Sequence, residues 1–183
     1  MELKEAIQIS LTYLGDEDAS VNNKTAQHPR LKLLVKCANL VIKEIATDYI
    51  PLIETEQVEV QGGRISYEKL LHRVLEILSV RNAADGIASN FRMTPTECVL
   101  HNENIKNASV KYSYMPVDIE IDEQCPVSPL VSAKTLALGI CAEYTLIQGM
   151  YEQSVAYSTR FKEDMRTAVR KKGEIKVKPR RWL

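Results

Sequence analysis

The residues best suited to chemistry are few, and the densest group of them is acidic. Four carboxylates stand together in the stretch VDIEIDEQ: Asp118, Glu120, Asp122 and Glu123. The first three are at alternate positions and would share one face of a strand, where their oxygens could hold a cation. Because Ile119 and Ile121 would point to the other face, the simpler interpretation is a strand with one solvated side.

The remaining candidate ligands and nucleophiles do not cluster in the sequence. The histidines occupy three different segments: His28, His72 and His101. The cysteines form no Cys-x-x-Cys pair: Cys37, Cys98, Cys125 and Cys141. This spacing favours surface or capping roles for the histidines, and buried, reduced positions for the cysteines. No phosphate loop, zinc-protease motif, nucleophile elbow or EF-hand is present. We therefore expect no catalytic residue, no metal, no cofactor and no enzymatic activity.

The charge of the chain is balanced overall but unevenly distributed. From Arg160 onward there are ten Lys and Arg residues against three Asp and Glu residues, although the whole chain has 24 of each kind. The preceding residues therefore carry a net negative charge. A basic end on an acidic body is typical of a protein that recognises a partner.

The last eleven residues, GEIKVKPRRWL, form the segment that we call the arm, residues 173–183. The arm could be a basic tail without a specific role, could contact nucleic acid phosphates, or could dock on a partner protein. Its apolar and basic residues alternate as in a strand added to a sheet edge, and it ends in a hydrophobic anchor, so docking explains most of its residues. The predicted partner-binding residues are Ile175, Lys176, Val177, Lys178, Arg180, Arg181, Trp182 and Leu183.

Composition indicates a soluble globular protein. Hydrophobic residues make up 45% of the 183 positions and charged residues 26%, which is enough to bury a core. The start, MELKEAIQISLTYLG, lacks the basic and apolar regions of a signal peptide. No run approaches the roughly 20 apolar residues of a membrane span. We expect the protein to be intracellular when made.

Helical periodicity marks both ends of the chain. An apolar stripe over residues 3–14 ends at Gly15, and a polar loop follows. The spacing predicts a long helix from Pro29 to Tyr49. After residue 130 two helices are expected on either side of Gly149, as an antiparallel hairpin or one kinked helix. Their aromatic residues suit core packing or an interface equally well: Tyr144, Tyr151, Tyr157 and Phe161.

Between these helices the sequence has the character of strands. Gly62 and Gly63 predict a hairpin, RVLEILSVRNA reads as a buried strand, and two short strands are expected around Pro95. In ASVKYSYMP, alternation places Val110, Tyr112 and Tyr114 on one face.

The predicted fold is α+β, a helical bundle with a central β-rich insertion and an extended C-terminal arm. Its parts are a helical part of the core (1–50), the β-rich insertion (51–122), a helical hairpin completing the core (123–172) and the arm (173–183).

The order of elements resembles that of the head–tail connector, or neck adaptor, proteins of tailed bacteriophages. The long helix LLVKCANLVIKEIATDYIPL runs straight into a β segment. The closing hairpin ALGICAEYTLIQGMYEQSVAYSTRFKEDM and the basic end KPRRWL follow in the same order as in that family. The likeness covers nearly the whole chain.

This resemblance implies a structural virion protein at the neck, present in the host cytoplasm during assembly. Proteins of this family form a ring, commonly a dodecamer, below the portal. The ring extends the DNA channel and presents a surface to the tail or a further neck protein. The arm would dock on the portal protein or a neighbouring subunit, and DNA would pass through without sequence-specific contact. No membrane partner is implied. The alternative from the residues alone is a nucleic-acid-binding module that uses the basic arm.

Overall fold

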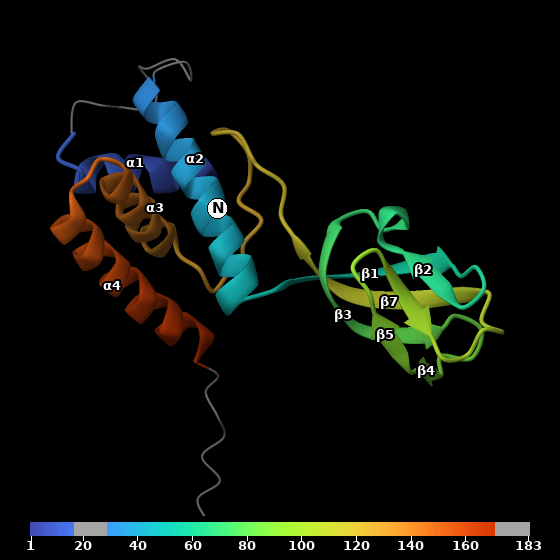
Figure 1. The fold of residues 1–183 in the computed structure, drawn as a ribbon. Coiled ribbons are helices and arrows are strands. Elements are labelled where there is room, and N and C mark those ends of the chain that lie inside the picture. The colour runs from blue at the N-terminus through green and yellow to red at the C-terminus, as the bar shows by residue number, and fades with distance from the viewer. Residues whose placement is uncertain (17–28, 171–183) are drawn as a thin grey trace, which may run out of the picture.

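The computed structural model describes residues 1–16 and 29–170 and combines helices with antiparallel sheets, so the predicted α+β class is confirmed. Figure 1 shows the helices gathered on one side and the strands on the other. We call residues 1–16, 29–50 and 116–170 the helical body, and residues 51–115 the β-unit.

Four α-helices form where apolar residues recur at helical spacing. They are α1 (Leu3–Tyr13), α2 (Pro29–Glu44), α3 (Ala133–Ile147) and α4 (Tyr151–Val169). Two predicted boundaries are confirmed. Gly15 follows α1 with a φ of 72°, which glycine adopts without strain, and Pro29 begins α2.

The end of the second helix differs from the prediction of a single α-helix. After α2 the chain continues as a π-helix, η1 (Ile45–Tyr49), in which the amide of Ile50 donates to the carbonyl of Ile45 at 2.8 Å. Ile50 itself is extended because Pro51 follows it.

Helices from both ends of the chain share one hydrophobic core. α3 and α4 form an antiparallel hairpin rather than one kinked helix, with Gly149 at a φ of 75° between them (Figure 1). α2 and α3 approach closely at Gly139, where a Cβ atom would lie 2.6 Å from Cγ1 of Val41. Fully buried members of this core come from all four helices, for example Ile7, Leu34, Ile140 and Met165.

The β-unit has a second, separate core between two antiparallel sheets. Its strands are β1 (Leu52–Glu59), β2 (Arg64–Ser66), β3 (Arg73–Asn82), β4 (Ala88–Ser89), β5 (Phe91–Met93), β6 (Glu97–Leu100) and β7 (Asn107–Met115), with a short 3-10 helix, η2 (Tyr67–Lys69), after β2. One sheet has the order β1-β7-β3-β4 and the other β2-β6-β5. Buried side chains of both sheets, including Ile65, Cys98 and Tyr112, join in one cluster.

Some of the predicted strands are confirmed. β5 and β6 flank Pro95 as expected, and β7 buries Val110 and Tyr112 on one face while Lys111 is exposed. Tyr114 is only half-buried, however, and Ser113 on the other face is buried.

Two other strand predictions are wrong. Gly62 and Gly63 do form a tight turn, closed by a single β-bridge between Gln61 and Arg64. The strands on either side of this turn do not form a hairpin, because β1 pairs with β7 and β2 pairs with β6. β3 is half-buried rather than buried, because only its inner face meets the core.

The predicted strand at the acidic stretch is also wrong. Residues 116–123 contain no strand, and Ile119 and Ile121 instead pack into the core of the helical body. Asn39, buried on α2, holds this segment in place. Its side-chain amide donates to the carbonyl of Ile119 and its side-chain oxygen accepts from the Ile119 amide, each at 3.0 Å. Lys43 adds an ion pair with Asp118 at 2.5 Å.

Replacing Asn39 by Ala is expected to lower the free energy of unfolding by about 2–4 kcal/mol, because both buried backbone groups of Ile119 lose their partners. Urea unfolding followed by circular dichroism measures this change. Asn39→Asp keeps only the acceptor and should fall between Ala and wild type. The control Asn104→Ala, at an exposed position, should change stability by less than about 0.5 kcal/mol. A similarly small change for Asn39→Ala would contradict the anchoring role.

Candidate assembly interface

The predicted partner-binding residues all belong to the arm, and they lie outside the described residues. Whether they bind a partner therefore stays a prediction. The described surface, however, has two features on which another protein chain could dock: an apolar end of the α3–α4 hairpin and the free edge of β1.

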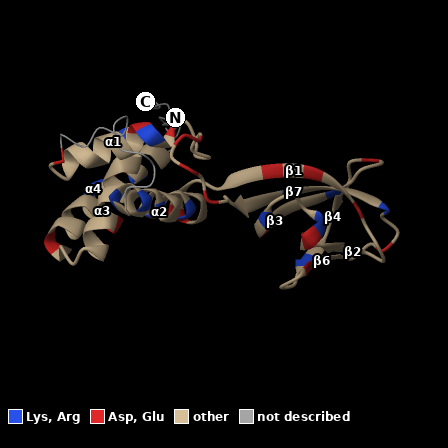
Figure 2. Ribbon diagram, turned by 90° about the horizontal axis from the view of Figure 1, so that it is seen from above, with Lys and Arg blue, Asp and Glu red and all other residues tan. Residues whose placement is uncertain are grey.

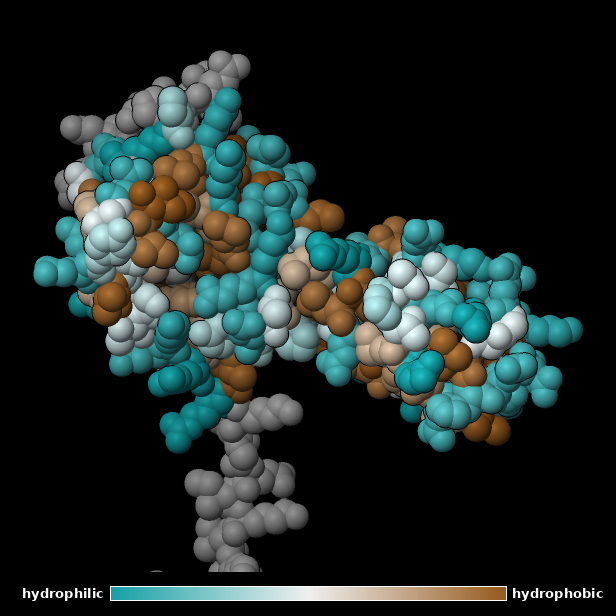
Figure 3. Space-filling view, in the orientation of Figure 1, coloured by the Kyte–Doolittle hydropathy of each residue, from teal (hydrophilic) through white to brown (hydrophobic). Residues whose placement is uncertain are grey.

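The turn between α3 and α4 exposes an unusual number of large apolar side chains. We call this group the hairpin tip, and its members are Leu146, Ile147, Met150, Tyr151 and Val155. Tyr151 is 68% exposed and Val155 65%. Single exposed apolar residues are common, but a contiguous group usually marks an interaction site. Figure 3 shows hydrophobic residues interrupting the hydrophilic surface of the helical body on the face it draws.

The aromatic residues, which suited core or interface equally well from sequence, divide between the two. Tyr144 and Phe161 are buried, and Tyr157 is half-buried with its hydroxyl donating to the carbonyl of Tyr13 at 2.8 Å. Tyr151 alone of the four belongs to the exposed hairpin tip. Sequence periodicity missed the tip because Ile147 and Tyr151 lie on either side of the helix break.

β1 is an edge strand of eight residues whose only strand partner in the described part of the chain is β7. The opposite edge of its sheet, β4, has two residues, and the edges of the second sheet, β2 and β5, have three each. Long edges are normally blunted by charged side chains, lysine above all, by proline or by a bulge. β1 contains no lysine and no proline, and its register with β7 has no shift, so its glutamates are the only device of this kind on the strand.

The pairing shows which backbone groups of β1 face away from β7. The amide of Val60 donates to the carbonyl of Lys106 at 2.8 Å, and residues along an antiparallel strand alternate in direction. The N–H and C=O groups of Ile53, Thr55 and Gln57 therefore point to the free edge. Consistent with this, the amide of Thr55 contacts only a side chain, Oε1 of Glu54 at 3.3 Å.

The charges on β1 are all negative. Glu54, Glu56 and Glu59 are its only charged residues, and Figure 2 shows this acidic segment along the strand. Glu54 and Glu56 stand on the inner side and are half-buried at the rim, whereas Glu59 is exposed on the outer side. Glu56 accepts hydrogen bonds from the hydroxyl of Tyr112 and from the amide of Leu71. Burial, and then this bond to a carboxylate, raise the pKa of Tyr112 above its ordinary value.

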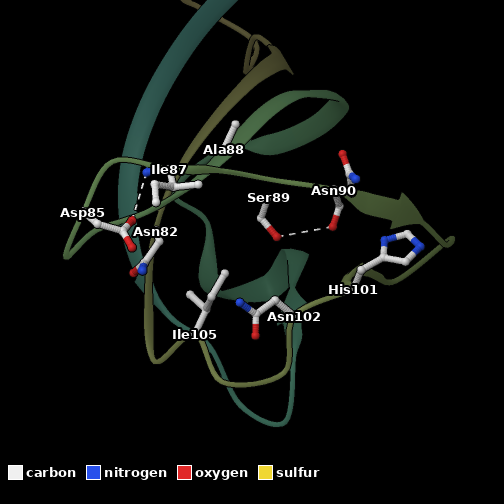
Figure 4. A pocket seen from close by; sticks show the side chains of 9 residues that line it. All are labelled: Asn82, Asp85, Ile87, Ala88, Ser89, Asn90, His101, Asn102 and Ile105. Atoms are coloured by element: carbon white, nitrogen blue, oxygen red, sulfur yellow. Dashed lines mark hydrogen bonds between the residues drawn. The ribbon is translucent and has the colours of Figure 1, made fainter.

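The polar pocket of the β-unit has a structural explanation. A pocket of about 310 Å³ in the β-unit is lined mostly by polar residues (Figure 4). The side-chain oxygens of Asn82, Asp85 and Asn102 each accept a hydrogen bond from the backbone amide two residues further on. The N···O distances are 3.2, 2.9 and 3.1 Å. These are turn-forming contacts, and His101 lies across the pocket from Asp85 (Figure 4). The polar lining therefore shapes loops and does not converge on a ligand.

Three of the four cysteines, Cys37, Cys98 and Cys141, are buried as predicted, whereas Cys125 is half-buried. Burial raises the pKa of Cys141 to about 12 and that of Cys37 to about 11, so these thiols stay protonated at neutral pH. His72 stacks on the ring of Tyr114, with centroids 4.2 Å apart. Within residues 1–16 and 29–170, no three His, Cys, Asp or Glu side chains are arranged to hold a metal ion.

Comparisons with known proteins add no relative. Neither a protein-family model nor a curated protein matches the sequence. Among the helices of the described part, none is long and apolar enough to cross a membrane.

The burial of Tyr112 and its hydrogen bond to Glu56 predict that this tyrosine ionises at a higher pH than an ordinary tyrosine. An ordinary tyrosine ionises at about pH 10, and the raised pKa of Tyr112 means that the folded protein keeps this proton at higher pH than the unfolded chain. The contribution of Tyr112 to stability should therefore be constant below about pH 10 and fall as the pH rises further. When tyrosine ionisation is followed by phenolate absorbance, the step at the highest pH should be present in the wild type and absent from Tyr112→Phe.

Two glutamate variants test the cause of this shift. Glu56→Gln should move the last step to lower pH, because the negative acceptor is removed. Glu59→Gln, on the outer side of the same strand, should leave the titration unchanged. An identical curve for Glu56→Gln and wild type would contradict the assigned pair.

Proposed function

We propose that the protein is a structural virion protein, a head–tail connector of tailed bacteriophages. It forms a ring below the portal that extends the DNA channel and joins capsid to tail. In this proposal the helices of both chain ends make up a bundle, the β-unit is an insertion in it, and the arm docks on the portal or on a neighbouring subunit.

The observation that carries the proposal is the presence of two unlike candidate docking surfaces on one chain. A ring is built from heterologous contacts, in which one patch of each subunit meets a different patch of the next. The hairpin tip is apolar and lies on the helical body, whereas the β1 edge is acidic and lies on the β-unit. A basic arm supplies a third element of opposite charge to that edge.

The order of secondary structure supports the same proposal. A long helix passes directly into a β segment, and a helical hairpin closes the fold before the basic arm, in the order that the sequence shares with connector proteins. The polar groups that line the pocket of the β-unit form turns, so this pocket does not favour an enzyme instead.

Deleting the arm should abolish association while leaving the fold intact, because both hydrophobic cores consist of described residues that precede it. The test is light-scattering mass over a range of concentrations, for the full chain and for a chain that ends at Lys172, with electron microscopy of any large species. Unchanged circular dichroism of the shortened chain is the control. We expect a discrete ring from the full chain, alone or with the portal protein from the same source, and monomers from the shortened one.

Two results would count against the proposal. A full chain that stays monomeric with and without the portal protein contradicts the connector function. Binding to duplex DNA that falls steeply with salt, and that is lost in Arg180→Ala with Arg181→Ala, would favour the nucleic-acid-binding alternative.

A further inference from the structure

We propose that the free edge of β1 receives residues 174–178 of a second copy of this chain as an added antiparallel strand. This inference rests on the proposed function, in which subunits assemble through the arm. It goes further by naming the acceptor: the outward backbone groups of Ile53, Thr55 and Gln57, together with the carboxylate of Glu54.

The backbone of β1 has what strand addition requires. An added strand gains its affinity from main-chain hydrogen bonds and its specificity from alternating side chains. The outward groups of β1 repeat at every second residue along a register without shifts. One of them, the Thr55 amide, has only a 3.3 Å contact with Glu54 that an incoming carbonyl can replace.

The side chains of the arm match both faces of this edge. In EIKVK, Ile175 and Val177 fall on one face and Lys176 and Lys178 on the other. The lysines would lie beside the inner-side carboxylate of Glu54. The apolar pair would cover the exposed side chain of Ile53, which is 46% accessible on the outer side.

The length of the match is limited by proline. Pro179 follows the alternating segment directly, and proline has no amide to donate to a ladder. The added strand would therefore end at Lys178, and the arginines and Trp182 would continue past the edge.

The direction of the chain argues for a second copy rather than for the chain's own arm. The end of α4 lies near the residues that precede β1, since Arg166 and Arg170 line the same hollow as Asp48 and Tyr49. An arm that left this point and followed its own β1 would run parallel to it. Every strand pair in the described structure is antiparallel, and only residues 171–173 separate Arg170 from the alternating segment. A link of this length spans roughly 14 Å at most, too little to bring the chain's own arm to the far end of β1 for an antiparallel pairing.

The test measures the association constant of full-length variants by sedimentation equilibrium. Thr55→Pro removes one outward amide and keeps the pairing with β7, so it should weaken association about fivefold to tenfold or more. The matched control is Thr55→Ala, which loses the same side chain but keeps the amide, and it should associate as wild type does.

Charge reversal gives a second, independent set of variants. Glu54→Lys, or Lys176→Glu with Lys178→Glu, should each weaken association, and the two changes combined in one chain should restore it. Two controls carry the same charge changes elsewhere: Glu68→Lys, exposed on the β-unit, and Lys171→Glu with Lys172→Glu, before the alternating segment. Neither control should have an effect of this size.

Mixing two defective chains tests the direction of the contact. The Thr55→Pro chain keeps a normal arm, and the Lys176→Glu, Lys178→Glu chain keeps a normal edge, so an equimolar mixture should form a one-to-one complex more tightly than either chain associates with itself.

The outcomes separate this inference from the proposed function. Wild-type association by Thr55→Pro, together with loss of association on arm deletion, overturns docking on β1 and leaves the connector proposal standing. A wild-type chain that stays monomeric by itself also overturns docking on β1. In that case, binding to the portal protein decides the connector proposal.

Discussion

The fold depends on how the chain returns from the β-unit to the helical body between β7 and α3. The four helices share one core, yet α2 and α3 are separated in sequence by every strand. Where the chain comes back to the helices, the two hydrogen bonds with Asn39 satisfy both the N–H and the C=O group of the buried residue Ile119. Because Ile119 and Ile121 then enter the helical core, α3 starts from a fixed position and meets Val41 at Gly139.

The same route through the β-unit explains why β1 has a free edge. A chain that leaves and returns at neighbouring points brings its first and last strands together, and β1 accordingly pairs with β7 along its whole length. The turn at Gly62 and Gly63 then directs β2 into the other sheet, where it pairs with β6. No strand of the described chain is left to cover the other side of β1. The open edge is thus a consequence of the topology, and its carboxylates decide which segments it would accept.

Sequence reasoning succeeded where one local signal decides the structure and failed where partners are distant. Gly15, Pro29 and Gly149 mark real boundaries because their backbone preferences act locally. The turn at Gly62 was also visible, but the pairing of Glu54 with Tyr112 joins residues far apart in sequence, and no local pattern encodes it. The acidic stretch alternates like a strand, yet its isoleucines are buried by helices. Alternation of apolar and polar residues indicates which side chains are buried, but it does not show whether a sheet or a group of helices buries them.

The two candidate docking surfaces would have a geometric consequence for an assembly that used both. A single strand-addition contact leaves the rotation between neighbours loosely defined, and a heterologous contact whose rotation does not close produces a filament instead of a ring. The hairpin tip lies on the helical body and the β1 edge on the β-unit, and Figure 1 shows these two parts on opposite sides of the molecule. If neighbours engage both, each contact restricts the rotation that the other leaves free. In the proposed ring, contacts of the helical body and of the β-unit would therefore have to act together for the ring to close.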